Sequence, residues 1–311
     1  MSRNKKGVAI HGWVNIDKPQ GLTSNQVLGR VRRMLNAQKL GHAGTLDPLA
    51  TGILPIALGE ATKTIPFVQD RDKVYRFTAT WGEERNTDDA EGEIVKTSAL
   101  RPTSADIEGL IPRFLGDISQ VPPQFSAVKI NGERAYHLAR QGEEFDIKPR
   151  TVTVFDLKMV NFDQNLTEFE MECSKGTYVR AIARDMGRIF GCFGYISRLR
   201  RLAVGNFSEE NAISLDEFEK MVLTSPADRY LMPVETVLDD IPALALTDIE
   251  IGRIRQGQSI RLISRQDLER LDLSGIDGAS DELILALGDH GPVALLERDG
   301  PELHPVRVFN L

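Results

Sequence analysis

The sequence predicts an α+β protein with a mixed, largely antiparallel sheet, flanking helices and a small C-terminal module that is mostly β. Residues 74–81 alternate aromatic and smaller side chains with the two-residue period of a strand. Residues 151–157 and 166–173 read as two further strands, which we expect to pair in antiparallel fashion. Apolar residues at helical spacing recur between these strands.

The N-terminal part of the chain begins with a predicted strand at residues 14–17. Ser24 is the candidate cap of a helix that follows it. The apolar face of that helix carries Val27, Leu28, Val31 and Leu35, and the opposite face carries Arg30 and Arg33. An apolar run at residues 52–58, interrupted only by Pro55, predicts a buried or edge strand.

The middle of the chain alternates loops, helices and strands. Residues 83–93 are polar and acidic, and we interpret them as a solvated loop. Residues 105–115 and 215–221 carry helical patterns, and residues 195–207 are typical of a strand rich in arginine. The apolar face of a further helix is expected from Val179, Ile182, Ala183, Met186 and Phe190.

Two changes of composition divide the chain. The sequence turns acidic after about Asn206, and Pro242 with a new start at Thr247 indicates a boundary near Leu244. We therefore predict a catalytic domain at residues 1–244 and a small module at residues 245–311. Within the first domain, residues 125–149 contain an Asn131-Gly132 turn and a short helical pattern, which favours a projecting, mobile element.

The formal net charge of −7 is an argument against a nucleic-acid partner, because phosphate binding usually requires a basic surface. The basic residues are nevertheless unevenly distributed, so local positive patches are predicted. The first cluster consists of Lys5, Lys6, Lys18, Arg30, Arg32, Arg33 and Lys39, and the second of Arg180, Arg184, Arg188, Arg198, Arg200 and Arg201.

No metal or cofactor is expected from the sequence. Its only cysteines, Cys173 and Cys192, are interpreted as ordinary buried thiols of a reducing cytoplasm. Five scattered histidines give no zinc pattern: His11, His42, His137, His290 and His304. No apolar signal core follows the basic N-terminus and no apolar run approaches the length of a bilayer span, which predicts a cytoplasmic protein without a membrane partner.

The most informative segment is Gly41 to Pro55, which places one carboxylate, Asp47, among glycines, prolines and small hydroxyl residues. Gly44 and Gly52 allow backbone angles or close approaches that other residues resist, and Pro48 restricts Asp47 to an extended conformation. A stiff loop of this kind suits a nucleophile or general base, which must be held close to its target atom.

Other interpretations of Asp47 remain open from chemistry alone. An Asp before Pro in a glycine-rich loop is commonly a turn residue. A glycosidase would need a second carboxylate, for which Asp88, Asp89 and Glu91 are candidates. A phosphate-binding loop does not fit, because the lysine and hydroxyl that close such a loop are absent at the required spacing.

The run GHAGTLDPLATGILPIALGEATK, from Gly41 to Lys63, resembles the catalytic motif of the TruB family of pseudouridine synthases. The likeness is to the bacterial members that modify a uridine in the T-arm of tRNA, position 55. It continues at four other places and covers at least the first two thirds of the chain. Those places are WVNIDKP at residues 13–19, KVY at 73–75, PPQFSA at 122–127 and GTYVR at 176–180.

This resemblance implies a pseudouridine-synthase-like fold with a C-terminal RNA-binding module like a PUA domain. It implies that Asp47 is the nucleophile, which attacks either the sugar C1′ or the pyrimidine C6, and that Arg180 pairs with it. Without the resemblance, Arg180 is better explained by a surface ion pair with Asp185 or Glu172.

The resemblance also implies roles in holding a base that is turned out of its stack. Tyr75 would stack on the base and take part in proton transfer, although a half-buried strand tyrosine is the ordinary alternative. His42 would occupy the gap left by the base, and Tyr178 and Leu199 would contact substrate, with core packing a nearly equal account of Leu199. Lys18 would brace the loop or a phosphate, where an exposed lysine is the simple alternative.

The segment at residues 125–149 resembles the family's mobile thumb loop, with Arg134, His137 and Arg140 facing phosphate. The predicted function is therefore cofactor-independent isomerisation of a T-loop uridine in tRNA by a monomer. Two alternatives stay open: an RNA-binding or RNA-folding protein without chemistry, and a hydrolase of nucleoside or glycoside bonds. Relatives that act within a guide-RNA particle are expected to carry basic extensions, which here amount to Arg3, Lys5 and Lys6 alone.

Overall fold

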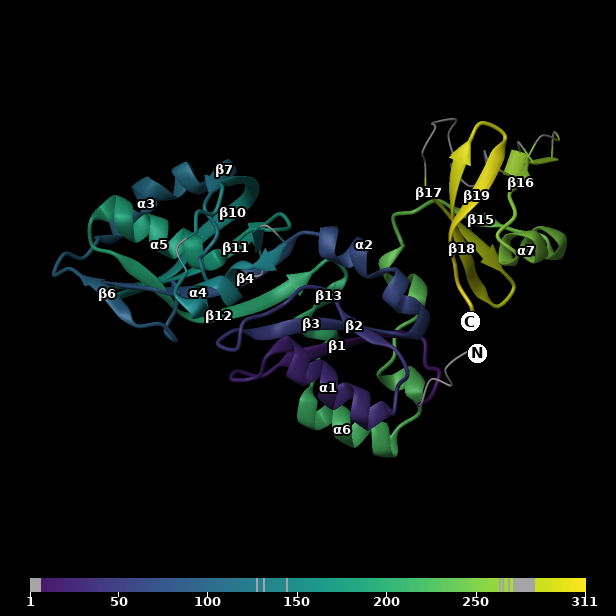
Figure 1. Cartoon of the computed structure of the whole chain (residues 1–311), viewed down its shortest axis with the longest axis horizontal. Helices are drawn as coiled ribbons and strands as arrows, with labels where there is room; N and C mark the ends of the chain where they lie inside the picture. The colour runs from purple at the N-terminus through teal and green to yellow at the C-terminus, as the bar shows by residue number, and fades with distance from the viewer. Residues whose placement is uncertain are drawn as a thin grey trace.

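The computed structural model describes residues 7–126, 128–130, 132–143, 145–262, 264, 266–267, 269–270 and 283–311. Their strands form two principal sheets (Figure 1). The large sheet follows the order β14-β1-β3-β12-β4-β11-β10-β7, with β2 added to β3 and β13 added to β12. Its strands are β1 (Gly12–Lys18), β2 (Leu40–His42), β3 (Thr51–Leu58), β4 (Lys73–Trp81), β7 (Gly116–Gln120), β10 (Arg150–Asp163), β11 (Leu166–Cys173), β12 (Gly194–Val204), β13 (Phe207–Ser208) and β14 (Ile213–Ser214).

The large sheet is mixed but mostly antiparallel, as predicted. Strands β10 and β11 pair antiparallel, and β11 continues onto β4 in the same sense. Strand β12 runs antiparallel to β4 and parallel to β3, where Arg201 lies opposite Gly52. Strand β12 therefore joins the part of the sheet that follows the Asp47 loop to the part that carries Tyr75.

Helices cover both parts of this sheet (Figure 1). Val27, Val31 and Leu35 of α1 are buried in the main hydrophobic core, which confirms the predicted apolar face. The helices are α1 (Ser24–Leu35), α2 (Ile65–Asp70), α3 (Ser104–Leu110), α4 (Ala135–Gln141), α5 (Val179–Phe190), α6 (Leu215–Thr224) and α7 (Asp248–Arg255). Short 3₁₀ turns are η1 (Gly59–Lys63), η2 (Ile111–Phe114), η3 (Glu209–Asn211), η4 (Ala227–Arg229) and η5 (Val234–Val237).

The prediction that Ser24 caps α1 was wrong by one residue. Thr23 is the N-cap: its side chain accepts from the Gln26 amide, and the Gln26 side chain accepts from the Thr23 amide. Ser24 lies inside the first turn with its hydroxyl turned inward, where it is free to bind another segment.

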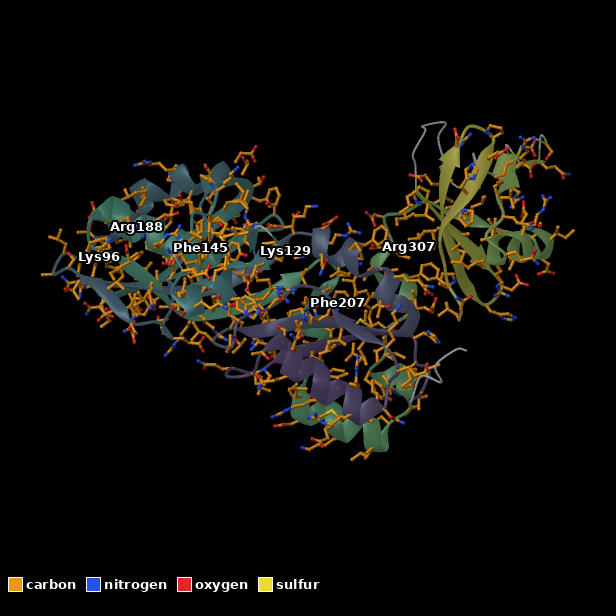
Figure 2. The ribbon with its side chains drawn as sticks, viewed as in Figure 1. Lys96, Lys129, Phe145, Arg188, Phe207 and Arg307 are labelled. Carbon is orange, nitrogen blue, oxygen red and sulfur yellow. The ribbon has the colours of Figure 1, made fainter. Side chains whose placement is uncertain are left out.

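The second sheet lies in the C-terminal part of the chain, at the upper right of Figure 1, and has the order β15-β17-β18-β19-β16. Its core is continuous with the rest of the protein: Leu285, Leu295 and Phe309 share one hydrophobic cluster with Trp13 and Phe207. Phe207 lies near the middle of the molecule, with its ring centre 5.3 Å from that of Trp13 (Figure 2). The strands are β15 (Ala243–Ala245), β16 (Ile260–Arg261), β17 (Leu283–Gly288), β18 (Gly291–Asp299) and β19 (Glu302–Val308).

The predicted thumb-like segment contains a small hairpin and a helix. Strands β8 (Lys129–Ile130) and β9 (Glu133–Arg134) pair in antiparallel fashion, and Gly132 between them lies in a turn with a φ of +93°. Asn131, the other residue of the predicted turn, lies outside the described residues. Helix α4 follows, with Arg134, His137 and Arg140 exposed, while Ala135 and Leu138 are buried.

The prediction that residues 83–93 form a solvated loop was wrong, because several of their acidic side chains are buried. Strands β5 (Glu83–Arg85) and β6 (Ile94–Thr97) enclose the segment as a hairpin. Glu84, Asp88 and Asp89 are at most 7% exposed, because arginines of α5 lie beside them.

None of the helices in the described part of the chain has the combined length and apolar composition that a bilayer crossing needs.

Candidate active site

Asp47 lies on the loop between β2 and β3, and α1 holds this loop from one side. The buried Ser24 hydroxyl donates to the Leu46 carbonyl at 3.0 Å and accepts from the Leu46 amide at 2.8 Å. The Gly21 amide donates to the Pro48 carbonyl at 2.8 Å. The residues on both sides of Asp47 are thus tied to the segment that leads into α1, which confirms the stiff loop expected from the glycines and prolines.

Lys18, at the end of β1, is fully buried and lies behind the same loop. Its ammonium donates to the carbonyls of Pro19, Leu22 and Pro48 at 3.0, 2.6 and 3.4 Å. Burial lowers the pKa of Lys18 to about 8, against the opposing effect of Asp47. Of the roles expected for Lys18, this geometry supports bracing of the loop, and its burial argues against a phosphate contact.

Arg201, in β12, holds the loop from the other side. Its side chain donates to the Ile53 carbonyl at 2.7 Å and to the Gly44 carbonyl at 3.1 Å, and the residue is 1% exposed. Gly44 and Gly52 have φ values of +97° and +99°, and a Cβ on Gly52 would lie 2.1 Å from the Arg201 carbonyl oxygen. The close approach predicted from these glycines is therefore made by β12.

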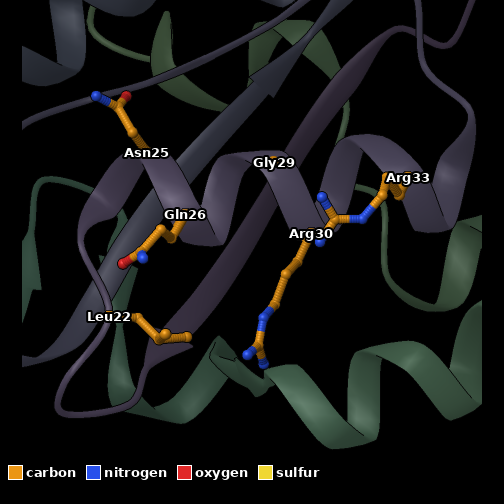
Figure 3. Close-up of a pocket in the computed structure, with 6 residues that line it drawn as sticks. All are labelled: Leu22, Asn25, Gln26, Gly29, Arg30 and Arg33. Carbon is orange, nitrogen blue, oxygen red and sulfur yellow. The ribbon is translucent and has the colours of Figure 1, made fainter.

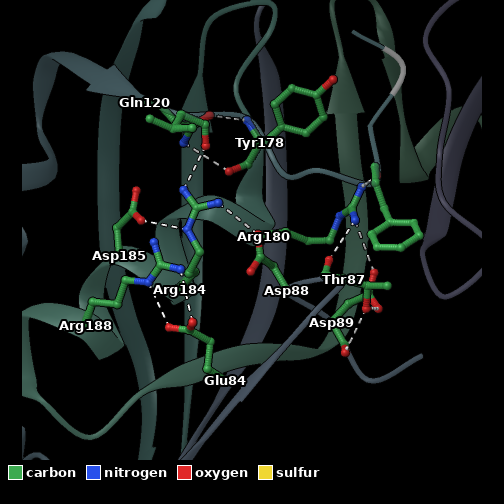
Figure 4. Close-up of polar contacts among 12 residues, drawn as sticks. Glu84, Thr87, Asp88, Asp89, Gln120, Tyr178, Arg180, Arg184, Asp185 and Arg188 are labelled. Carbon is green, nitrogen blue, oxygen red and sulfur yellow. Dashed lines mark hydrogen bonds and ion pairs between the residues drawn. The ribbon is translucent and has the colours of Figure 1, made fainter. Parts of the chain in front are cut away.

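Arg180, on the first turn of α5, makes the contact that defines the site. Its Nη2 lies 3.0 Å from Asp47 Oδ2, and the same nitrogen donates to the Phe125 carbonyl at 3.0 Å. Its Nη1 donates to the Thr87 carbonyl at 2.9 Å and lies 3.4 Å from Asp89 Oδ2 (Figure 4). The alternative of a surface pair with Asp185 or Glu172 is excluded, because the Arg180 side chain is only 6% exposed and its partners are these four groups.

The Asp47 carboxylate is recessed but reachable. Burial raises the pKa of Asp47, the Arg180 guanidinium opposes this shift, and the neighbouring Asp89 carboxylate adds to it. The side chain is still 38% exposed, so a ligand can contact it. A desolvated carboxylate held by a single guanidinium is a stronger nucleophile than a fully hydrated one, and the Arg180 guanidinium favours the ionised form of Asp47.

Tyr75 and His42 lie near Arg201. Tyr75 is opposite Arg201 in the pairing of β4 with β12, and its pKa is raised by burial, an effect that Arg201 opposes. The phenol is therefore protonated at neutral pH. Burial and Arg201 lower the pKa of His42, and its buried Nδ1 has no hydrogen-bond partner within the described structure. A neutral imidazole with one unused nitrogen thus lies at the base of the Asp47 loop.

Tyr178 and Leu199 differ in how far they are available to a ligand. Tyr178 is the N-cap residue of α5, and its backbone exchanges two hydrogen bonds with the Gln120 side chain (Figure 4). The Arg150 guanidinium lies 4.6 Å from the centre of the Tyr178 ring. Its ring is partly exposed. Leu199 is 9% exposed and belongs to the main core, so the structure favours packing as its principal role.

The second basic cluster is not the positive patch that we predicted. Arg180, Arg184 and Arg201 are buried, and Arg188 and Arg200 are engaged in ion pairs with Glu84, Asp17 and Glu209. Arg188 and Arg198 of this cluster are exposed. In the first cluster, the exposed arginines are Arg30, Arg32 and Arg33 of α1. Arg30 and Arg33 line a shallow pocket of about 340 Å³ with Leu22, Asn25, Gln26 and Gly29 (Figure 3).

The sequence interpretation missed Arg201 and Asp89 as parts of the site. Arg201 was assigned to a surface cluster, and Asp89 was named only as a second carboxylate for a glycosidase. In the structure Asp89 Oδ2 is bound to Arg180, so it does not face an open space opposite Asp47. The described residues contain no group of three or more His, Cys, Asp or Glu side chains arranged to hold a metal ion.

Solved structures share the architecture of this chain. The chain superimposes along its whole length on 92% of a chain in the structure of an H/ACA RNP bound to a substrate RNA containing 2′-deoxyuridine, with a TM-score of 0.71 and 19% identity. It matches 93% of a chain in the archaeal box H/ACA sRNP Nop10-Cbf5 complex with a TM-score of 0.70 and 20% identity. At this level of identity the likeness concerns the fold.

The sequence comparisons identify the family. Residues 32–179 match the model of the TruB family pseudouridylate synthase N-terminal domain, and residues 180–239 match that of the tRNA pseudouridylate synthase B C-terminal domain. The chain is 52% identical to tRNA pseudouridine synthase B of Caulobacter vibrioides over 100% of both chains. It is 50% identical to the protein of the same name from Rhodopseudomonas palustris, over 97% of this chain and 81% of that protein. The chain belongs to the TruB family of pseudouridylate synthases.

Proposed function

We propose that this protein converts a uridine of tRNA, the one at position 55 in the T-loop, to pseudouridine with Asp47 as the nucleophile. The observation that carries the proposal is the contact of 3.0 Å between Arg180 Nη2 and a recessed Asp47 carboxylate. The proposal is also supported by relatives about half identical over the full chain that bear the name tRNA pseudouridine synthase B.

The reaction is an isomerisation. The bond between N1 of the base and C1′ of the ribose breaks, the base turns, and a bond forms between C5 and C1′. The proton on C5 is then lost, and N1 gains one. Attack of Asp47 on C1′ would hold the ribose while the base turns, and attack on C6 would hold the base instead. Both routes use one carboxylate and need no external oxidant, metal or cofactor.

The surrounding residues suit the handling of a base turned out of its stack. We assign Tyr75, with its protonated phenol, to stacking on the uracil, and neutral His42 to the space that the base leaves. Tyr178 is assigned to a contact through its partly exposed ring. Lys18 acts behind the loop rather than on the substrate. The substrate contact assigned to Leu199 has the least support, because Leu199 is part of the hydrophobic core.

Three parts of the chain are assigned a role in the proposed binding of tRNA. We propose that residues 1–244 form the catalytic domain, that residues 245–311 form an RNA-binding module, and that residues 125–149 close on the T-arm with Arg134, His137 and Arg140 facing phosphate. These three side chains are exposed on one short segment. That segment begins at Phe125, whose carbonyl is bound by Arg180. Equal cleavage of the segment by a protease with and without RNA would contradict its role. The proposed enzyme acts as a monomer in the cytoplasm.

The test uses tRNA and an isolated T-arm stem-loop, both unmodified and carrying tritium at uridine C5, without added metal or nucleotide. Formation of the new carbon bond must expel the label. Wild type should release it from both RNAs without free uracil. Asp47→Asn should bind RNA and release at least about a thousandfold less label per unit time. Asp216→Asn, the same change on the exposed face of α6, is the matched control and should behave as wild type.

Two other outcomes would replace the proposal. If wild type and Asp47→Asn both bind tRNA and neither releases label, the protein is an RNA-binding or RNA-folding protein without chemistry. If wild type releases free uracil, it is a hydrolase. Release from tRNA but not from the isolated stem-loop would retain the isomerase and reject the T-arm as a sufficient substrate.

A further inference from the structure

Two arginines, one turn apart on α5, hold two consecutive aspartates of the β5–β6 hairpin. Arg180 Nη1 lies 3.4 Å from Asp89 Oδ2, and Arg184 Nη1 lies 2.9 Å from Asp88 Oδ2. Figure 4 shows both arginines reaching from α5 toward the turn that contains Thr87, Asp88 and Asp89. The Arg184 and Asp88 side chains are only 6% and 9% exposed, so this second pair is as deeply buried as the first.

The backbone at Asp88 is in an unusual conformation. Its φ is +60°, in the left-handed region that residues other than glycine seldom occupy. The Asp88 amide donates to the Arg85 carbonyl at 3.0 Å, and its carbonyl accepts from the Ile196 amide at 3.1 Å. A strained residue persists only where its surroundings hold it, and the ion pair to Arg184 is the side-chain contact that does so.

The same arginines also hold the start of the thumb-like segment. Arg184 Nη2 donates to the Val121 carbonyl at 2.8 Å, and Arg180 Nη2 donates to the Phe125 carbonyl at 3.0 Å. Each arginine therefore joins the aspartate turn to the segment that leads into residues 125–149. Arg180 makes one further contact, with Asp47, and its position depends on both of these neighbours.

We propose that Asp88 and Arg184 form a positioning pair for the isomerisation: they hold the Thr87–Asp89 turn and the start of the thumb-like segment so that Arg180 faces Asp47. This inference rests on the proposed function. Neither residue touches the reacting atoms, since Arg180 lies between them and Asp47. Loss of the pair would let the turn relax from its left-handed conformation, and the Thr87 carbonyl and Asp89 carboxylate would move away from Arg180.

The Asp88 carboxyl can change charge in an accessible range of pH. Burial raises its pKa to about 6, and Arg184 and Arg180 oppose the shift. Above this value the carboxylate is charged and pairs with Arg184; below it the carboxyl is neutral and the attraction is lost. The hollow of about 480 Å³ beside the pair admits solvent. The other charged groups around Asp88 are Arg188 and Asp185 of α5, Glu84 and Arg85 of β5, Asp89 next to it, and Asp146 across the hollow.

The experiment compares kcat of wild type and Asp88→Asn at saturating tritium-labelled tRNA from pH 5.5 to pH 8.5. Asn has the shape of a protonated Asp. The ratio of wild-type to variant kcat should be about ten- to a hundredfold at pH 8. It should be roughly three- to fourfold smaller at pH 5.5, where about a quarter of the Asp88 carboxyl is still ionised. Dividing the two rates removes the pH effects that act equally on both proteins. KM should change less than about twofold, since neither residue contacts RNA in the proposal.

Asp185→Asn is the matched control. Asp185 is the other carboxylate on Arg184, at 2.8 Å from its Nε, but it is 31% exposed and does not belong to the turn. Its kcat should stay near that of wild type at every pH. Arg184→Lys, which keeps the charge, should retain more activity than Arg184→Gln, and this comparison decides the question if Asp88→Asn does not fold.

A ratio that is constant with pH, or a kcat of Asp88→Asn equal to that of wild type at pH 8, would overturn the positioning role. Equal losses in Arg184→Lys and Arg184→Gln would also overturn it. All of these results require active wild-type enzyme. Absence of label release by wild type would instead overturn the proposed function, so the two failures are distinguishable.

Discussion

Replacing Arg180 by Gln tests how the protein keeps its nucleophile ionised. Gln retains an amide hydrogen-bond donor, but its side chain is shorter than that of Arg and carries no charge. The change leaves two carboxylates, Asp47 and Asp89, without the cation that lies 3.0 and 3.4 Å from them. Burial already raises the pKa of Asp47, and removal of Arg180 takes away the largest opposing effect. At neutral pH a larger fraction of Asp47 is then protonated, and a protonated carboxyl is not a nucleophile.

The size of the effect follows from the distance. Two unit charges 3.0 Å apart attract by about 1.4 kcal/mol in bulk water and by about 5.5 kcal/mol at an effective dielectric constant of 20. Because the Asp47 side chain is 38% exposed, a value between these limits applies, about 2 to 3 kcal/mol. That range corresponds to a loss of roughly 30- to 150-fold in kcat at pH 7.

The assay is tritium release under single-turnover conditions, with saturating enzyme in excess over tRNA, from pH 6 to pH 9. The activity of Arg180→Gln should recover with rising pH, because loss of the cation raises the pKa of Asp47 and a higher pH ionises it again. The control is Arg188→Gln, on the same helix, whose guanidinium is 49% exposed and binds Glu84. Its kcat should remain within about twofold of wild type.

A loss in Arg180→Gln that is equal at every pH would refute the electrostatic reasoning and leave orientation of Asp47 as the only role of Arg180. Full activity at pH 7 would refute the contact itself as a catalytic feature. A fall in melting temperature large enough to unfold the variant would be detected by calorimetry before the kinetics are interpreted.

The same structure makes three further predictions. Lys18→Met should lower the melting temperature by roughly 2 to 8 °C at pH 7, because buried carbonyls lose their donor. Calorimetry should also show that the stability of wild type rises between about pH 8 and 10.5, because in this range the folded chain has released the Lys18 proton and the unfolded chain has not. The variant should lack this rise, and a rise of equal size in both proteins would contradict the reasoning. Gly52→Ala should destabilise the fold by roughly 3 kcal/mol or more in urea titrations, since its φ is +99° and its Cβ would meet the Arg201 carbonyl, whereas the exposed Gly109→Ala on α3 should be nearly neutral. The double change Arg30→Gln and Arg33→Gln should weaken tRNA binding. It should also reduce the slope of log affinity against log salt concentration by about 0.9 for each phosphate that the variant no longer neutralises. An unchanged slope would show that the α1 face does not bind RNA.

Local patterns predicted most of the elements. The alternation in β4, the apolar faces of α1 and α5 and the pairing of β10 with β11 follow from periods of 2 and 3.6 residues, and the structure confirms them. The cap of α1 was wrong by one residue because Thr23 and Ser24 are both good capping residues, and tertiary contact with Leu46 engages the second.

The exposure of charged residues was the property that the sequence predicted least well. The segment at 83–93 was expected to be solvated, yet Asp88 binds Arg184, which is 96 residues away in the chain. Arg201 was expected on a basic surface, yet it is buried against Ile53 and Gly44. Burial of a charge depends on a partner, and the sequence does not reveal which distant residue supplies it.

The Asp47 loop and most of the helices and strands could be predicted from the sequence, because backbone freedom at Gly, its restriction at Pro and the spacing of apolar residues are properties of neighbouring positions. The family could be predicted from the motif at Gly41–Lys63. Which charges meet depends on the folded chain. Strand β12 brings Arg201 beneath the loop, and α5 brings Arg180 onto Asp47 and Arg184 onto Asp88. These contacts join residues far apart in the chain, and the free energy of a buried charge depends on the distances that folding creates between them.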